Sequence, residues 1–123
     1  MRTIVIDDSR AIRSILRRIL TDLGFEVLEA GNGKEALSTL AASGPVELAL
    51  VDWNMPEMNG YEFLKAFRAD PSSANTKIIM VTTETGTEEM IKAIEAGANE
   101  YVMKPFDKEM IASKLEILGI PAC

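Results

Sequence analysis

Four short apolar runs in this sequence are each followed by polar side chains of kinds that could do chemistry. These polar residues are, in chain order, Asp7 and Asp8, Asp52, Thr82 and Thr83, and Lys104. Any one of them alone is an ordinary solvated strand end. If the runs are neighbouring strands of one sheet, three carboxylates, a hydroxyl group and an ammonium group meet at a single edge, where they could bind a metal ion and a phosphoryl group.

The three carboxylates indicate a site for a hard divalent cation. Clustered carboxylates repel one another, and one or more would be protonated near neutral pH unless a cation lay between them. The chain has no histidine, and a site made of oxygen atoms alone is typical of Mg²⁺, with Mn²⁺ as a second candidate. Mg²⁺ usually takes one or two carboxylates and completes its shell with water and phosphate oxygens.

Asp52 is the candidate nucleophile, because it follows the run predicted to be the central strand. A carboxylate can attack phosphorus and form an aspartyl phosphate. Thr82, as a hydrogen-bond donor, and Lys104, as a cation, would then hold the other oxygens of the transferred group. The predicted chemistry is therefore transfer of a phosphoryl group to Asp52.

The elements that must bring these side chains together alternate along the chain. The predicted strands are Thr3–Ile6, Glu26–Ala30, Glu47–Val51, Lys77–Val81 and Tyr101–Met103. Apolar residues at helical spacing predict five helices between and after them. These helices are the segment Ile12–Leu23 that ends at Gly24, Glu35–Leu40, Tyr61–Arg68, a segment capped by Thr87 that contains Met90, Ile91 and Ile94, and a segment capped by Asp107 that contains Ile111, Leu115 and Leu118.

This alternation predicts one α/β domain over residues 1–123, a doubly wound (βα)5 sandwich with a five-stranded parallel sheet. The strand order that we expect is the flavodoxin-like order 2-1-3-4-5. The second strand, in which Glu26 and Glu29 interrupt the apolar residues, is predicted to lie at an edge. In such a sheet all strands end on one side, and ligands bind there, where the strand order reverses. The fold therefore predicts that the polar strand ends meet.

Composition excludes several classes of function. The 123-residue chain has 19 acidic and 13 basic residues, a net charge of −6, which argues against binding nucleic acid or an anionic membrane surface. No apolar run is long enough to span a bilayer, and no signal peptide precedes the first apolar run. The single cysteine, Cys123, permits no internal disulfide bond. We therefore expect a cytoplasmic protein.

The ordered set of motifs resembles the receiver domains of two-component response regulators, most closely the free-standing chemotaxis regulators of the CheY type. The motifs are Asp7-Asp8, the segment from Asp52 to Gly60 (DWNMPEMNG), Thr82, and Lys104-Pro105-Phe106. The resemblance covers the whole chain. It implies that Asp52 accepts the phosphoryl group from a histidine on a partner kinase, and that the Lys104-Pro105 bond is cis.

The resemblance also implies roles for the neighbouring residues. Asp8 and Asp52 would bind Mg²⁺ directly, Asp7 through water, and Asn54 by its backbone carbonyl. Thr82 and Lys104 would hold phosphoryl oxygens, and Tyr101 would swing inward when Thr82 moves. The resemblance thus implies a signalling domain that catalyses only its own phosphorylation and dephosphorylation.

Three residues are expected to tune the lifetime of the phosphoryl group. Asn54 and Glu84 match positions that flank the path of the attacking water in the family, where they are typical of fast-cycling regulators. Thr83 stands where the family usually has Ala, Gly or Ser. Its bulk is expected to slow the access of water.

We expect a monomer that passes its signal to a downstream output protein, for example a component of the flagellar motor switch. The predicted partner surface consists of Met90, Ile91, Tyr101, Met103, Met110, Lys114 and Ile117. Met110 and Ile117 lie beside the inner stripe of the last helix instead of within it. The alternative account, that these apolar residues only widen the contact with the core, stays open at this point.

Two other functions are compatible with parts of the pattern. A Mg²⁺-dependent phosphatase of the haloacid-dehalogenase type also forms an aspartyl phosphate, but it expects Asp-x-Asp after the first strand, where this chain has Asp7-Asp8-Ser9. The chain could also be a receiver cut from a longer regulator with a DNA-binding or enzymatic output domain.

Overall fold

The computed structural model describes residues 1–83 and 86–120. Its strands form one parallel sheet in the order β2-β1-β3-β4-β5, as predicted. The strands are β1 (Arg2–Ile6), β2 (Glu26–Ala30), β3 (Leu48–Val51), β4 (Lys77–Thr82) and β5 (Glu100–Met103). The helices are α1 (Arg10–Asp22), α2 (Gly33–Ser43), α3 (Gly60–Ala69), α4 (Thr87–Glu95) and α5 (Lys108–Ile117), and a short 3₁₀ helix, η1, spans Pro71–Ser73.

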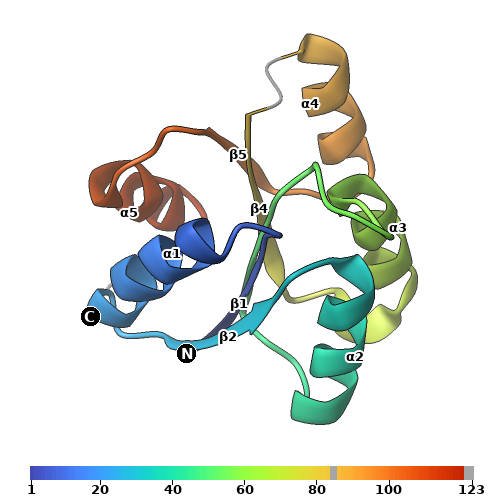
Figure 1. Cartoon of the computed structure of the whole chain (residues 1–123), viewed down its shortest axis with the longest axis horizontal. Helices are drawn as coiled ribbons and strands as arrows, with labels where there is room; N and C mark the ends of the chain where they lie inside the picture. Colours follow the sequence, from blue (N-terminus) through green and yellow to red (C-terminus); the bar gives the residue numbers. More distant parts are fainter. Residues whose placement is uncertain (84–85, 121–123) are drawn as a thin grey trace.

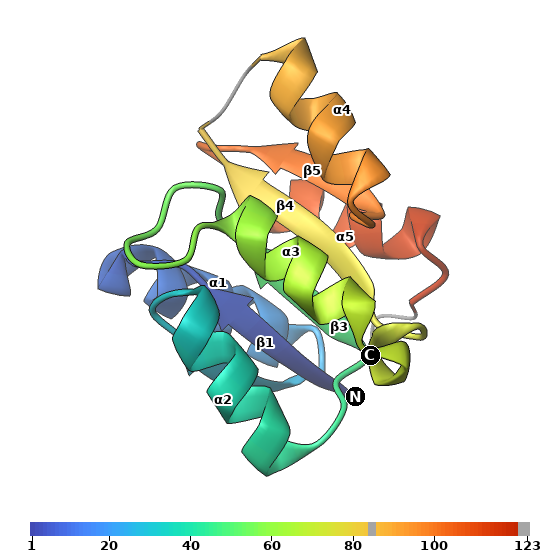
Figure 2. The ribbon, with the colours of Figure 1, turned by 90° about the vertical axis from the view of Figure 1, so that its right-hand side faces the viewer.

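The sheet lies between two layers of helices (Figure 1). α1 and α5 cover one face, and α2, α3 and α4 lie in a row over the other (Figure 2). Successive residues of a strand point to opposite faces, so Ile4 and Ile6 pack under α2 and α3 while Val5 packs under α1. β2 is an edge strand with Glu26 exposed, as predicted, and β5 forms the other edge.

Short polar side chains begin four of the five α-helices that the structure describes, and of these caps only Asp107 was predicted. Ser9, Asn32 and Asp107 each accept a hydrogen bond from a backbone N–H in the first turn of the helix that follows. Asn59 forms a capping box with Glu62 at the start of α3. These caps satisfy backbone N–H groups that have no partner within the helix, and they place each helix directly after its strand.

The predicted cap of α4 is wrong. The N-cap residue is Gly86, which makes no side-chain cap hydrogen bond, and Thr87 is already the first helical residue. The chain enters the helical conformation one residue earlier than a threonine cap requires. Only Ala93 of α4 is buried, while Met90, Ile91 and Ile94 are exposed. α4 is therefore attached to the core by a narrow contact.

The short 3₁₀ helix η1 was not predicted from the sequence. The Asp70 side chain accepts a hydrogen bond from Ser72 N, and Pro71 begins the turn.

No helix in the described part of the chain is long and apolar enough to cross a membrane.

Candidate functional site

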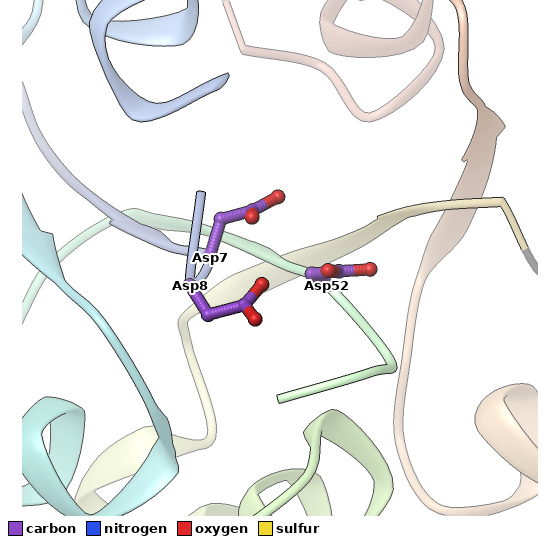
Figure 3. Close-up of side chains that lie close together, drawn as sticks. All are labelled: Asp7, Asp8 and Asp52. Atoms are coloured by element: carbon purple, nitrogen blue, oxygen red, sulfur yellow. The ribbon is translucent and has the colours of Figure 1, made fainter. Parts of the chain in front are cut away.

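Three aspartates meet at the carboxyl ends of β1 and β3. These strands are neighbours in register, with Ile6 opposite Val51, so Asp7 and Asp52 leave the sheet side by side. Figure 3 shows Asp7, Asp8 and Asp52 close together, and one carboxylate oxygen from each lies within 4.8 Å of the others. Asp7 and Asp52 are buried, whereas Asp8 is exposed. The site is thus open to solvent on the side of Asp8.

Lys104 and Thr82 complete this group, as the strand ends predict. The Lys104 ammonium lies 2.8 Å from Asp7 Oδ2 and 3.5 Å from Asp52 Oδ2, and its side chain is only 14% exposed. Thr82 is the last residue of β4 and is fully buried, with its hydroxyl hydrogen-bonded to Asp52. The Lys104-Pro105 peptide bond is cis, as the resemblance implied. One cation therefore faces two buried carboxylates.

The surroundings of Asp52 oppose its negative charge. Burial raises the pKa of the Asp52 carboxyl, and the nearby charge of Asp7 raises it further, while Lys104 and the Thr82 hydroxyl act in the opposite direction. The net result is a pKa above the ordinary range. A divalent cation at this point would remove the conflict, and three carboxylates with oxygen atoms this close are a suitable donor set for Mg²⁺.

The loop from Trp53 to Asn59 forms the remaining wall. Asn54 is exposed and lines the same hollow as Asp8 and Asn59. Trp53 is half-buried and stacks on Tyr61 at 5.4 Å between ring centroids. Met55 and Met58 pack against the core under α2 and α3. The loop thus holds one side of the site while leaving the Asn54 side accessible.

Gly60 closes this loop directly against Asp52. Its N–H donates to the Trp53 carbonyl oxygen at 2.9 Å, and α3 begins at this residue. A Cβ atom added here would overlap the Asp52 carbonyl oxygen. The start of α3 therefore touches the backbone of the candidate phospho-acceptor.

The residues expected to tune the lifetime of the phosphoryl group are only partly placed. Thr83 follows β4 directly and is exposed. Glu84 lies outside the described residues. Asn54 lines the hollow beside Asp8. Two of the three residues therefore lie next to the site.

The predicted partner surface surrounds the edge strand β5. On the helices, Met90, Ile91, Met110 and Ile117 are 39%, 50%, 39% and 64% exposed, and Ile94 is 47% exposed, a residue that the prediction of this surface missed. Ile94 stands one helical turn after Met90 and Ile91, and this spacing in the sequence could have placed it on the same surface. Tyr101 is only 9% exposed. It shares a hollow with Met103, Met110 and Lys114, and Lys114 pairs with Glu100 at 2.8 Å.

Comparison with known proteins identifies the family. The model of the response regulator receiver domain matches residues 3–116. The chain belongs to this family. The receiver is 46% identical to a chemotaxis protein CheY homologue of Campylobacter jejuni over 97% of its own length and 93% of the relative. It is 44% identical to chemotaxis protein CheY1 of Helicobacter pylori, with 96% of each chain covered.

Comparison with solved structures supports the same family. The structure of Vibrio cholerae chemotaxis protein CheY4 superposes on this receiver with a TM-score of 0.88 at 35% identity, covering 94% of this chain and 96% of the other. The chain is a phospho-accepting signalling receiver closely related to the CheY chemotaxis regulators. Neither the phosphatase nor the excised receiver of a longer regulator is favoured by these matches.

Proposed function

We propose that this receiver takes a phosphoryl group from a phosphohistidine of a partner kinase onto Asp52 and thereby switches a protein-binding surface in chemotaxis signalling. The observation behind this proposal is the buried Asp52 carboxylate, held between two further aspartates and the Lys104 ammonium. We take residues 1–123 as one receiver domain that acts as a cytoplasmic monomer.

The proposed metal ligands are the oxygens that the site leaves available. Asp8 and Asp52 would hold Mg²⁺, or Mn²⁺, directly, Asp7 through water, and Asn54 by its backbone carbonyl. Asp7 suits the indirect role because one carboxylate oxygen already accepts from Ser9 N and the other pairs with Lys104. When bound, the ion supplies positive charge that balances the carboxylates and the phosphoryl oxygens.

The reaction is a displacement at phosphorus. A carboxylate oxygen of Asp52 forms the new P–O bond while the P–N bond to the kinase imidazole breaks, and the electron pair stays with the imidazole nitrogen. Lys104 and Thr82 donate hydrogen bonds to the equatorial oxygens. Water later attacks the same phosphorus and releases inorganic phosphate, which restores the Asp52 carboxylate. The receiver thus catalyses only its own phosphorylation and dephosphorylation.

Phosphorylation by a small donor tests this proposal without the kinase. Wild-type receiver incubated with acetyl phosphate and Mg²⁺ should gain the mass of one phosphoryl group, and hydroxylamine should remove it, because an acyl phosphate is open to attack at its carbonyl carbon. Omission of Mg²⁺ is the control. A mass increase that resists hydroxylamine would contradict the assignment to a carboxylate.

Thr83 is predicted to lengthen the life of the phosphoryl group. Its branched side chain follows Thr82 at the end of β4, on the exposed side of the site. Thr83→Ala should shorten the half-life by up to about tenfold, equivalent to roughly 1.4 kcal/mol of activation barrier. The measurement is loss of phosphoprotein after removal of acetyl phosphate, with Thr83→Ser as the matched control. An unchanged or longer half-life in Thr83→Ala would show that Thr83 does not hinder the water.

The switched surface is proposed to be the partner surface around β5 defined above. Thr82 and Met103 are paired neighbours on β4 and β5, so movement of Thr82 toward the phosphoryl group is transmitted to the strand that contains Tyr101. Tyr101 lines the hollow between β5 and α5. An apolar partner helix or peptide, such as one from a flagellar motor switch component, would dock there.

Two substitutions on this surface should separate binding from switching. Lys114→Glu should weaken partner binding with and without beryllofluoride, because it reverses a charge on the surface. Tyr101→Ala should mainly erase the difference between the two states, typically ~1–3 kcal/mol of coupling. The measurement is partner affinity by titration calorimetry. If both variants bind and respond like wild type, the output surface lies elsewhere.

A further inference from the structure

Asp8 is held in place only through its backbone. Its carboxylate is exposed, and within residues 1–83 and 86–120 it has no hydrogen bond or ion pair. β1 ends at Ile6, two residues earlier, so the sheet does not fix it directly. The position of Asp8 therefore depends on how the preceding residue, Asp7, is anchored.

Every polar atom of Asp7 has a partner. Its N–H donates to the Ala30 carbonyl at 3.1 Å, and its carboxylate oxygens accept from Ser9 N and Lys104. Its carbonyl oxygen, which belongs to the peptide group that leads into Asp8, accepts a hydrogen bond of 2.6 Å from Arg13 Nη1. Arg13 is thus the side chain that orients the Asp7–Asp8 peptide group.

Arg13 is itself held rigidly. Its Nε donates to Glu29 Oε1 at 3.1 Å, and its side chain is only 19% exposed. Glu29 lies on β2 and also pairs with Arg17, and the two arginines lower the pKa of its carboxyl despite the opposing effect of burial. The guanidinium therefore connects three elements, α1, β2 and the end of β1, with a charged hydrogen bond at each contact.

We propose that Arg13 is a positioning residue for the metal site: it fixes the Asp7–Asp8 peptide group and, through it, the place of the Asp8 carboxylate. This inference rests on the proposed function, which assigns Asp8 to the metal. Glu29 acts behind Arg13 as its second anchor. The arrangement resembles the outer partners that orient ligands in metal sites, whose loss typically weakens metal binding about 10–100-fold.

Charge alone predicts the opposite effect. Arg13 is a cation close to the site, so its repulsion of Mg²⁺ disappears when the charge is removed, and the metal should then bind more tightly. If Arg13 positions Asp8, removal of the guanidinium should weaken binding instead. The sign of the change in affinity therefore distinguishes positioning from simple electrostatics.

Arg17 provides a matched control. It lies one helical turn further along α1 and shares the partner Glu29, but its second hydrogen bond goes to the Val27 carbonyl, away from the site. Arg17→Gln and Arg13→Gln remove the same charge and the same type of contact with Glu29. Only Arg13→Gln also removes the hydrogen bond to Asp7.

The experiment measures binding of Mg²⁺ alone, by titration of Trp53 fluorescence and by calorimetry. Arg13→Gln should weaken Mg²⁺ binding about tenfold, and Arg17→Gln should change it by less than about twofold. Arg13→Lys keeps the charge but cannot reach both partners with a planar fork, so it should also weaken binding. Arg13→Gln and Arg13→Lys variants that bind Mg²⁺ as tightly as wild type, or more tightly, would overturn the proposal.

A second readout needs no metal. In the ¹H–¹⁵N spectrum of the metal-free protein, the Asp8 and Ser9 amide resonances should shift in Arg13→Gln and stay in place in Arg17→Gln. If Arg13→Gln does not fold, Arg13→Lys tests the same contact. Failure of the proposed function would appear separately, as wild type that takes up no phosphoryl group from acetyl phosphate, whereas failure of this inference leaves that reaction intact.

Discussion

Asp52→Asn is expected to take up no phosphoryl group from acetyl phosphate under conditions that label the wild type fully. The amide is not nucleophilic at neutral pH. Asp7 is buried and paired with Lys104, and Asp8 lies on the solvent side of the site. Intact-mass spectrometry after incubation with Mg²⁺ measures the loss. Full labelling of the variant would show that another residue is the acceptor.

The control for this result is the free energy of unfolding of Asp52→Asn compared with that of the wild type. Burial and Asp7 raise the pKa of Asp52 in the folded protein. The metal-free wild type therefore loses stability as pH rises from the ordinary carboxyl range through the raised folded-state pKa, because ionisation is easier in the unfolded chain. The Asp52→Asn variant does not lose stability in this way, because its amide does not ionise. Metal-free Asp52→Asn should unfold with a free energy about 1 kcal/mol larger than wild type above that range.

The affinity of the receiver for Mg²⁺ should depend more on Asp8 than on Asp7. The Asp8 carboxylate is exposed and, in the part of the chain that the structure describes, has no partner, so both of its oxygens are available. Asp8→Ala is expected to weaken Mg²⁺ binding about a hundredfold, or roughly 2.8 kcal/mol. Titration of Trp53 fluorescence with Mg²⁺ measures the change.

Asp7→Ala is the comparison. Its carboxylate already pairs with Lys104 and accepts from Ser9 N, so its loss should weaken Mg²⁺ binding by only about tenfold. Removal of Asp7 should also lower the pKa of Asp52, since one source of repulsion disappears. Equal losses of affinity in the two variants would contradict the ranking.

The strand ends were predictable because a parallel sheet leaves little freedom there. Apolar runs long enough to be strands, with helical spacing between them, imply one parallel sheet and one edge at which Asp7, Asp52, Thr82 and Lys104 must lie. The structure confirms the sheet order and brings these residues together. What their side chains do chemically stays a prediction from the resemblance.

Features that depend on individual side-chain contacts were not predictable. The contact of Arg13 with the Asp7 carbonyl depends on the direction of one long side chain, and nothing in the spacing of arginines along α1 separates Arg13 from Arg17. The exposure of Ile94 likewise goes with α4 having Ala93 as its one buried residue. Apolar periodicity indicates a helix but does not say how much of its apolar face the neighbours cover.

Gly60 shows that the site also constrains residues that have no functional group. Its hydrogen atom occupies the space where any other amino acid would place a Cβ atom, against the Asp52 carbonyl oxygen. Every missense mutation of this codon therefore pushes on the phospho-acceptor, whatever side chain it encodes. A residue with no chemistry of its own, eight positions after Asp52 in the chain, is consequently expected to tolerate no substitution.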